Sequence, residues 1–224
     1  MKKKILVIVS HPDDEILGCG GTIFNHLEDN DKVYIYFTHE GSSARFDSLK
    51  NPKISKEINK RNRIALKLAK DFKYKIVGFG GNTNLGTDKF DQLKTTKQII
   101  KIIKNIKPHT IYTHFSNDLN SDHNLTHQAV ISACRPVDFL VENIYLMEIP
   151  SSTDWNIQNE FKANYFNNIN IKIKLKMLKY YSSEMRKEPH PRSDKNIEAL
   201  SIYRGGQAGL KNSEAFMVYR LISK

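Results

Sequence analysis

The sequence predicts an α/β protein built on a doubly wound, mostly parallel β-sheet. Short runs of apolar and β-branched residues alternate along the chain with longer segments whose apolar residues recur at helical spacing. The apolar runs are nearly continuous, which is typical of parallel strands covered by helices on both faces. Polar clusters directly follow two of these runs, and ligands of open α/β sheets bind at that end of the strands.

The first predicted unit consists of two strands and the helix between them. The run Lys4–Ser10 is aliphatic and β-branched, and it predicts a buried strand. Gly18–Leu27 predicts a helix that packs closely through its small residues, and Lys32–Thr38 predicts the second strand. Because Gly18, Gly20 and Gly21 do not form the GxGxxG pattern and follow an acidic turn, they do not indicate dinucleotide binding.

The same alternation continues to about residue 185. The further predicted elements are a helix at 55–70, a strand at 74–79, a helix at 90–106, a strand at 110–113, a helix at 122–134, a strand at 143–149 and a helix at 171–185. Strands that alternate with helices predict a parallel sheet with the doubly wound strand order 3-2-1-4-5.

The length of 224 residues predicts one domain. We expect residues 1–149 to form the sheet core. The segment 150–224 is more irregular, and its Pro150–Trp155 and Pro189–Arg192 stretches predict a cap over the carboxyl edge of the sheet.

Charge and hydropathy restrict the partners and the location of the chain. The formal net charge of +11 suggests an acidic partner, although lysines at helical spacing, such as Lys101, Lys104 and Lys107, are typical of a solvated face. The N-terminal apolar run ends after Val9, which is too short for a signal peptide, and no run is long enough to span a bilayer. The sequence therefore predicts a soluble, cytoplasmic protein without stable membrane insertion.

An unusual concentration of ionisable groups follows the first strand. His11, Asp13, Asp14 and Glu15 stand within five residues, and a divalent cation would offset the repulsion between the carboxylates. Nitrogen and oxygen ligands together suit Zn²⁺. The alternative is a polar turn in which Asp13 or Asp14 only caps the next helix.

A second polar cluster, at 117–127, follows the fourth strand. In the predicted strand order the first and fourth strands are neighbours, so both clusters converge on one crevice. His11, Asp14 and His123 then form a three-ligand site that leaves a position for water, with one Zn²⁺ per chain expected and Fe²⁺ or Co²⁺ as alternatives. His127 is a further ligand, a supporting residue or a core histidine.

These residues resemble those of a known family. His11-Pro12-Asp13-Asp14-Glu15 with the following Gly18-Cys19-Gly20-Gly21-Thr22, and later Asp122-His123, are similar to the motifs of the LmbE-like, or PIG-L, de-N-acetylases. The resemblance implies a Rossmann-like zinc hydrolase that deacylates N-acylated amino sugars, with the metal on His11, Asp14 and His123. It also implies that Asp13 is the general base. Glu15 is the nearest residue that would take this role if Asp13 does not.

The chain departs from the family pattern at one catalytic position. The second motif often reads His-Pro-Asp-His, whereas this chain has Asn120 in place of the first histidine. An asparagine donates a hydrogen bond to an oxyanion but delivers no proton. We therefore expect His190, between two prolines, to supply that proton, with a pKa raised by nearby carboxylates; an inert surface loop is the alternative.

Four side chains are candidates for substrate binding. Arg45 follows the second strand and Arg192 stands in the predicted cap, where an arginine binds a hydroxyl or phosphate group; a simple loop arginine is the alternative for Arg45. The segments of Trp155 and Arg204 resemble segments of family members associated with surface-polysaccharide sugars, so that Trp155 stacks on a sugar ring or, alternatively, only packs in the core or lid. The expected substrate is an N-acetylated amino sugar, free or carried on a nucleotide or lipid for surface-glycan synthesis.

The rival function is a non-catalytic basic module that binds nucleotide or nucleic acid phosphates. The acidic residues of both clusters oppose it because carboxylates repel phosphate, so no nucleic acid partner is expected. The sequence does not predict the particular sugar or the oligomeric state.

Overall fold

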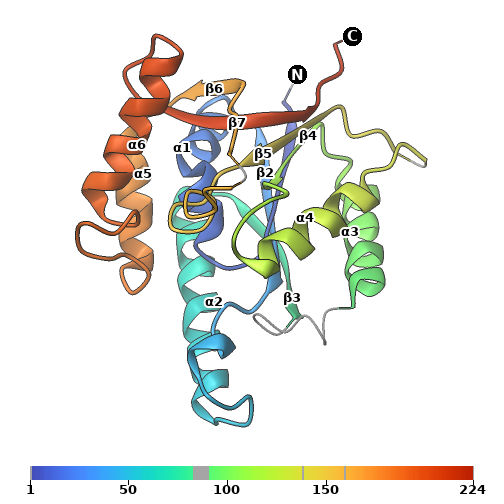
Figure 1. The fold of residues 1–224 in the computed structure, drawn as a ribbon. Helices are drawn as coiled ribbons and strands as arrows, with labels where there is room; N and C mark the ends of the chain where they lie inside the picture. Colours follow the sequence, from blue (N-terminus) through green and yellow to red (C-terminus); the bar gives the residue numbers. More distant parts are fainter. Residues whose placement is uncertain (1, 83–90, 138, 159, 224) are drawn as a thin grey trace.

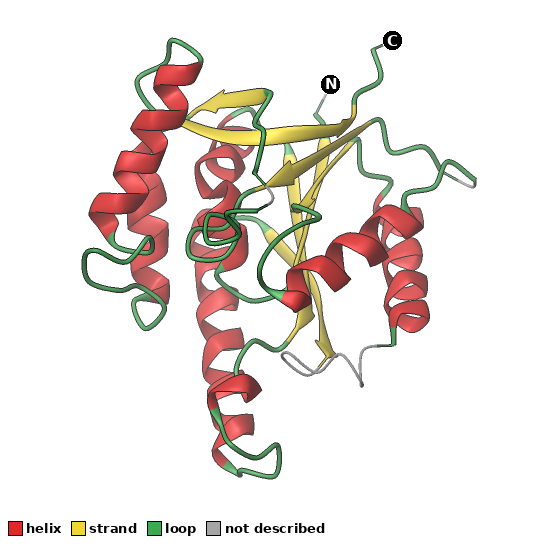
Figure 2. Ribbon diagram, viewed as in Figure 1, coloured by secondary structure: helices red, strands yellow, loops and turns green. Residues whose placement is uncertain are grey.

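A seven-stranded sheet forms the centre of the molecule (Figures 1 and 2). The computed structural model describes residues 2–82, 91–137, 139–158 and 160–223. The strands are β1 (Lys4–Val9), β2 (Lys32–His39), β3 (Lys75–Asn82), β4 (Thr110–His114), β5 (Asn143–Met147), β6 (Tyr165–Asn168) and β7 (Ser213–Arg220). Their order is β3-β2-β1-β4-β5-β7-β6, with the first five parallel and the last two antiparallel to their neighbours. The predicted fold class and the order 3-2-1-4-5 are confirmed.

Helices cover both faces of the sheet (Figure 1). They are α1 (Asp14–Glu28), α2 (Lys53–Phe72), α3 (Gln92–Ile106), α4 (Ser121–Ala133), α5 (Ile171–Leu178) and α6 (Asp194–Gln207). Alternate residues of β1 pack into opposite cores: Ile5, Val7 and Val9 face α1 and α2, whereas Leu6 and Ile8 face α3 and α4. Burial on both faces explains why this strand is continuously apolar.

Most predicted elements are present, with shifted ends. The first helix begins at Asp14 and not at Gly18, so the acidic residues form its first turn. Phe90, the predicted start of the third helix, lies outside the described residues. The predicted helix 171–185 ends at Leu178 and continues only as a 3-10 turn, Lys179–Tyr181.

The sheet does not end at residue 149, contrary to the expected boundary. β7 runs antiparallel beside β5, with Phe216 opposite Met147, and β6 pairs with β7 at the edge. The segment 150–224 thus supplies two strands and α6, none of them predicted, in addition to loops beside the carboxyl ends of the strands. Phe216 is fully buried, so this part of the segment belongs to the core. Among the described residues, no helix has both the length and the apolar character needed to cross a bilayer.

Candidate metal centre

The loop after β1 folds around its own carboxylates. The Asp14 Oδ2 atom accepts a hydrogen bond from the backbone N–H of His11 at 2.8 Å, and Glu15 Oε2 accepts one from Asp13 N at 2.9 Å. Asp13 has a φ of 133°, an unfavourable value for a residue with a side chain. Its side chain makes no capping hydrogen bond to α1, which excludes a simple capping role for Asp13.

The loop before α4 brings His123 to the same place. Asn120 caps this helix, since its Oδ1 accepts a hydrogen bond from Asp122 N at 2.9 Å, and His123 follows in the first turn. The Ser10 hydroxyl donates to the carbonyl oxygen of Asp122 at 2.9 Å and so joins the two loops. Because β1 and β4 are paired, the two clusters meet as predicted.

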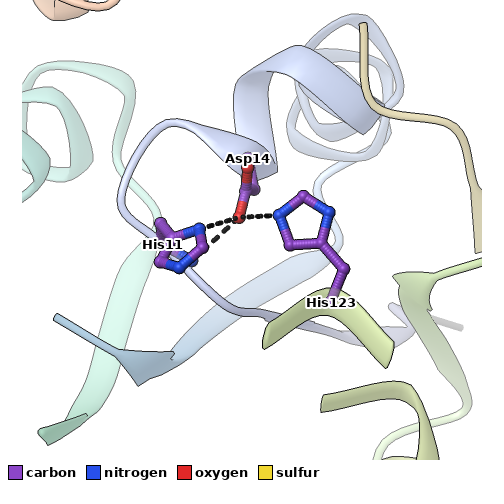
Figure 3. A group of neighbouring side chains, drawn as sticks. All are labelled: His11, Asp14 and His123. Carbon is purple, nitrogen blue, oxygen red and sulfur yellow. Dashed lines mark hydrogen bonds and ion pairs between the residues drawn. The ribbon is translucent and has the colours of Figure 1, made fainter. Parts of the chain in front are cut away.

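The side chains of His11, Asp14 and His123 converge on one point (Figure 3). All three are buried, and one ligand atom from each lies within 4.8 Å of the others. Asp14 Oδ2 is 3.2 Å from His11 Nδ1 and 3.3 Å from His123 Nε2. Ligands at zinc distances in a tetrahedron lie roughly 3.3–3.6 Å apart. The two pairs that include Asp14 therefore lie close to the spacing of ligands around one small four-coordinate cation, and the two histidine nitrogens lie within 4.8 Å of each other.

One ring nitrogen of each histidine faces Asp14, and a second carboxylate lies beside the other ring nitrogen. Asp122 Oδ2 lies 2.9 Å from His11 Nε2, and Asp118 Oδ1 lies 3.1 Å from His123 Nδ1. Asp118 also accepts hydrogen bonds from the hydroxyl groups of Ser152 and, at 2.6 Å, Thr153. Such carboxylates fix the tautomer and orientation of metal-ligating histidines. Sequence reasoning assigned neither role, although both residues lie in the polar cluster 117–127.

The electrostatics of the cluster also favour a cation. Although burial opposes the shift, Asp14 and Asp118 raise the pKa of His123 to about 10. Burial would raise the pKa of Asp14, but His123 and His11 hold it well below its usual range. A bound metal takes the place of the proton that these groups share, so metal binding would release a proton.

Two more histidines lie beside the cluster. The His114 ring stacks on His123 at a centroid distance of 3.9 Å, and its Nε2 accepts a hydrogen bond from Ser10 N. Burial lowers the pKa of His114 well below the usual value, so this ring is neutral. The Nδ1 of the half-buried His127 donates to the carbonyl of His114 at 2.9 Å and its ring packs on Tyr219, so His127 supports the strand residue His114.

Asp13 is held by two arginines. Arg61 Nη2 lies 2.9 Å from Asp13 Oδ1, and Arg192 Nη1 lies 3.1 Å from Asp13 Oδ2. Burial raises the pKa of Asp13, and the arginines oppose this shift. Sequence reasoning missed Arg61, although a signal existed: Arg61 stands on the same helix stripe as the buried Ile54, Ala65 and Leu68.

The predicted substrate-binding arginines each pair with a carboxylate. Arg192 reaches Asp13, while Arg45 pairs at 2.6 Å with Glu184, which is 3.6 Å from Arg61. Arg204, on α6, pairs at 2.6 Å with Glu148, the residue that follows β5.

His190 and Trp155 lie together, with ring centroids 5.3 Å apart. Burial, Arg192 and Arg186 lower the pKa of His190, opposite to the expected direction. The reason is that burial and these two arginines outweigh the opposing effect of Asp154, the one carboxylate among the causes of the shift.

The family model for GlcNAc-PI de-N-acetylase, PIG-L, matches residues 6–134. The chain belongs to the PIG-L family of de-N-acetylases. The matched segment contains both clusters of the metal centre, from β1 to the end of α4. A search of curated proteins finds no match.

Solved structures show the same fold. N,N'-diacetylchitobiose deacetylase from Pyrococcus horikoshii has a TM-score of 0.76 at 18% identity, covering 96% of this chain and 83% of that one. A deacetylase of the teicoplanin biosynthesis pathway has a TM-score of 0.73 at 14% identity, covering 99% and 100%. The 4-carboxy-2-hydroxymuconate hydratase from Pseudomonas putida, at 0.76 and 17% identity, covers 100% and 98%. The fold is thus shared by deacetylases and a hydratase, and the residues of the site decide the reaction.

Proposed function

We propose that this PIG-L family member is a zinc-dependent hydrolase that removes the acetyl group from the nitrogen of an amino sugar. The observation that carries the proposal is the convergence of His11 Nδ1, Asp14 Oδ2 and His123 Nε2 beside Asp13, which is not among the three ligands. When bound there, Zn²⁺ supplies Lewis-acid chemistry: it polarises the amide carbonyl and lowers the pKa of water from 15.7 to about 7.

Asp13 serves as the general base of this proposal. One arginine binds each of its oxygens, so the carboxylate has a fixed orientation and keeps lone pairs for a proton. Burial raises its pKa, which makes it a stronger base than an exposed aspartate. Asp13 takes the proton of the attacking water and passes it to the departing amine nitrogen, so that acetate and a free amine are formed.

Two other residues have roles that are open to test. Asn120 uses Oδ1 to cap α4, and its Nδ2 remains the atom with which it would donate to the oxyanion. His190 is the alternative proton donor, but its lowered pKa makes it mainly neutral at pH 7. In this proposal Asp13 therefore protonates the departing amine, and His190 is the alternative proton donor.

Acetate release tests the proposal directly. The purified protein is incubated with N-acetylated amino sugars, free and linked to a nucleotide or lipid, with and without a chelator. We expect release of acetate that stops on chelation and returns with Zn²⁺. Asp13→Asn should keep its zinc but lose about 10²–10⁴-fold in kcat, the usual contribution of a general base. Activity that survives complete metal removal would refute the zinc-dependent mechanism.

A further inference from the structure

A chain of three fully buried hydroxyl groups joins the end of β1 to α4 and β2 beside the metal centre. The Ser10 hydroxyl lies 2.9 Å from the carbonyl oxygen of Asp122 and 2.7 Å from Thr126 Oγ1. Thr126 Oγ1 lies 2.6 Å from Thr38 Oγ1, which in turn lies 2.9 Å from His39 Nδ1. Four short contacts therefore connect a backbone carbonyl of α4 to the ring of a histidine in β2.

The number of protons in this chain decides which atom donates at each contact. Four hydrogen bonds need four protons, and the hydroxyl groups of Ser10, Thr38 and Thr126 supply one each. The carbonyl oxygen at the far end supplies none, so the fourth proton comes from His39 Nδ1. The Thr38 hydroxyl has a second acceptor in the carbonyl of Val9, but at 3.4 Å this contact is much longer than the 2.6 Å contact to Thr126. The Thr38 proton therefore stays in the chain.

The distances around Asp122 agree with a proton on His39 Nδ1. Burial lowers the pKa of His39 to about 4, so the ring is neutral at pH 7 and carries a single proton. Nε2 then has no proton to donate, and it lies 3.7 Å from Asp122 Oδ1, beyond hydrogen-bond distance. His11 Nε2, by contrast, lies 2.9 Å from Asp122 Oδ2. Of these two rings, His11 is the one that donates to the carboxylate.

We propose that Thr38 and Thr126 are positioning residues that keep the proton of His39 on Nδ1. Asp122 then accepts a hydrogen bond from His11 and not from His39. A proton fixed on His11 Nε2 leaves a lone pair on Nδ1, the ring atom that would bind the metal. The effect on the metal rests on the proposed zinc-dependent function, whereas the position of the proton on His39 does not.

Removing either threonine hydroxyl should move this proton. In Thr126→Val the Thr38 hydroxyl loses its nearest acceptor, and the shorter of the two contacts that remain is the one to His39 Nδ1, at 2.9 Å against 3.4 Å to Val9. Thr38 then donates to Nδ1, and the ring proton is carried by Nε2, which faces Asp122. In Thr38→Val the Nδ1 proton loses its acceptor, with the same result. In both variants His39 competes with the metal-ligating ring for one carboxylate.

The test observes the tautomer of His39 directly. Protein labelled with ¹⁵N-histidine is studied by NMR spectra that correlate the ring nitrogens with the carbon-bound ring protons, because protonated and unprotonated nitrogens have well-separated shifts. His39→Gln assigns the signals by removing one set. Thr113→Val is the matched control, since Thr113 is a fully buried threonine of β4 whose hydroxyl makes no hydrogen bond among the described residues. The Kd for Zn²⁺ is measured on the same proteins by competition with a chelator.

We expect wild-type His39 to carry its proton on Nδ1 with and without Zn²⁺. Thr126→Val and Thr38→Val should move the proton to Nε2 and raise the Kd for Zn²⁺ by about tenfold, the lower end of the usual effect of a disturbed supporting partner. Thr126→Ser restores the hydroxyl, so it should keep both the tautomer and, within about twofold, the Kd of the wild type. Thr113→Val should do the same.

The possible failures are distinguishable. A wild-type His39 protonated on Nε2 would overturn the inference, and this spectrum decides even if a variant does not fold. A proton that stays on Nδ1 in both valine variants would overturn the role of the threonines. A moved proton with an unchanged Kd would overturn the effect on the metal. A wild type that has the expected tautomer but binds no Zn²⁺ would overturn the proposed zinc site and leave the assignment of His39 intact.

Discussion

Replacing Asp118 by asparagine tests how the protein orients His123, one of the three proposed metal ligands. In the structure this buried carboxylate lies 3.1 Å from His123 Nδ1 and also accepts hydrogen bonds from Thr153 Oγ1 at 2.6 Å and Asn120 N at 2.8 Å. Although burial opposes the shift, His123 lowers the pKa of Asp118 to about 2, so it is a carboxylate throughout the physiological range. The asparagine side chain that replaces it is uncharged and has only one oxygen to accept the hydrogen bonds from His123, Thr153 and Asn120.

Both orientations of the new amide weaken metal binding. If its NH₂ group faces His123, it donates to Nδ1 and selects the tautomer whose proton lies on Nε2, the atom needed by the metal. If its oxygen faces His123, the tautomer is kept but the negative charge is lost. Loss of such a supporting carboxylate typically costs 10–100-fold in metal affinity, or about 1.4–2.7 kcal/mol.

The measurement is a competition titration of Zn²⁺ against a chromophoric chelator, carried out on the metal-stripped protein. Asp154→Asn is the matched control, because Asp154 is an exposed aspartate near Ser152 with no contact to His123. Far-UV circular dichroism and Tm of the metal-free variants show whether the fold is kept. A folded Asp118→Asn protein whose Kd for Zn²⁺ lies within twofold of the wild type would refute the supporting role.

Three other substitutions test the site and the fold. His123→Ala should lose stoichiometric metal, measured by elemental analysis, while its circular dichroism spectrum stays near that of the wild type. His190→Ala should keep its metal, and its kcat should stay within about threefold of the wild type, because Asp13 protonates the departing amine. A loss of 10²-fold or more in kcat would show that His190 donates this proton. Gly21→Ala should lower the free energy of unfolding by about 1–3 kcal/mol, because its Cβ would lie 2.7 Å from Ile169 Cβ. Gly206→Ala, which meets no atom within 4 Å, should not destabilise the protein in the same denaturant titration.

The parallel half of the fold was predictable from local sequence. Continuous apolar runs such as Ile5–Val9 have no other favourable location than between two layers of helices, and the helical periods between them supply those layers. The C-terminal strands were not predictable in this way. β7 and β6 complete the edge of the sheet by antiparallel pairing with β5 and with each other, and their short runs gain stability only from these distant partners.

The sequence by itself predicted which side chains would come together, because His11 and Asp14 share one turn and the strand order brings His123 beside them. Only the tertiary structure decided what surrounds these three side chains. Arg61 reaches Asp13 from the middle of α2, and Ser152 and Thr153 reach Asp118 from the loop after β5. The pKa of His190 is the clearest case. Its direction is set first by burial and then by Arg192 and Arg186, and the burial of a side chain depends on which distant segments pack around it, which the neighbouring residues in the chain do not reveal.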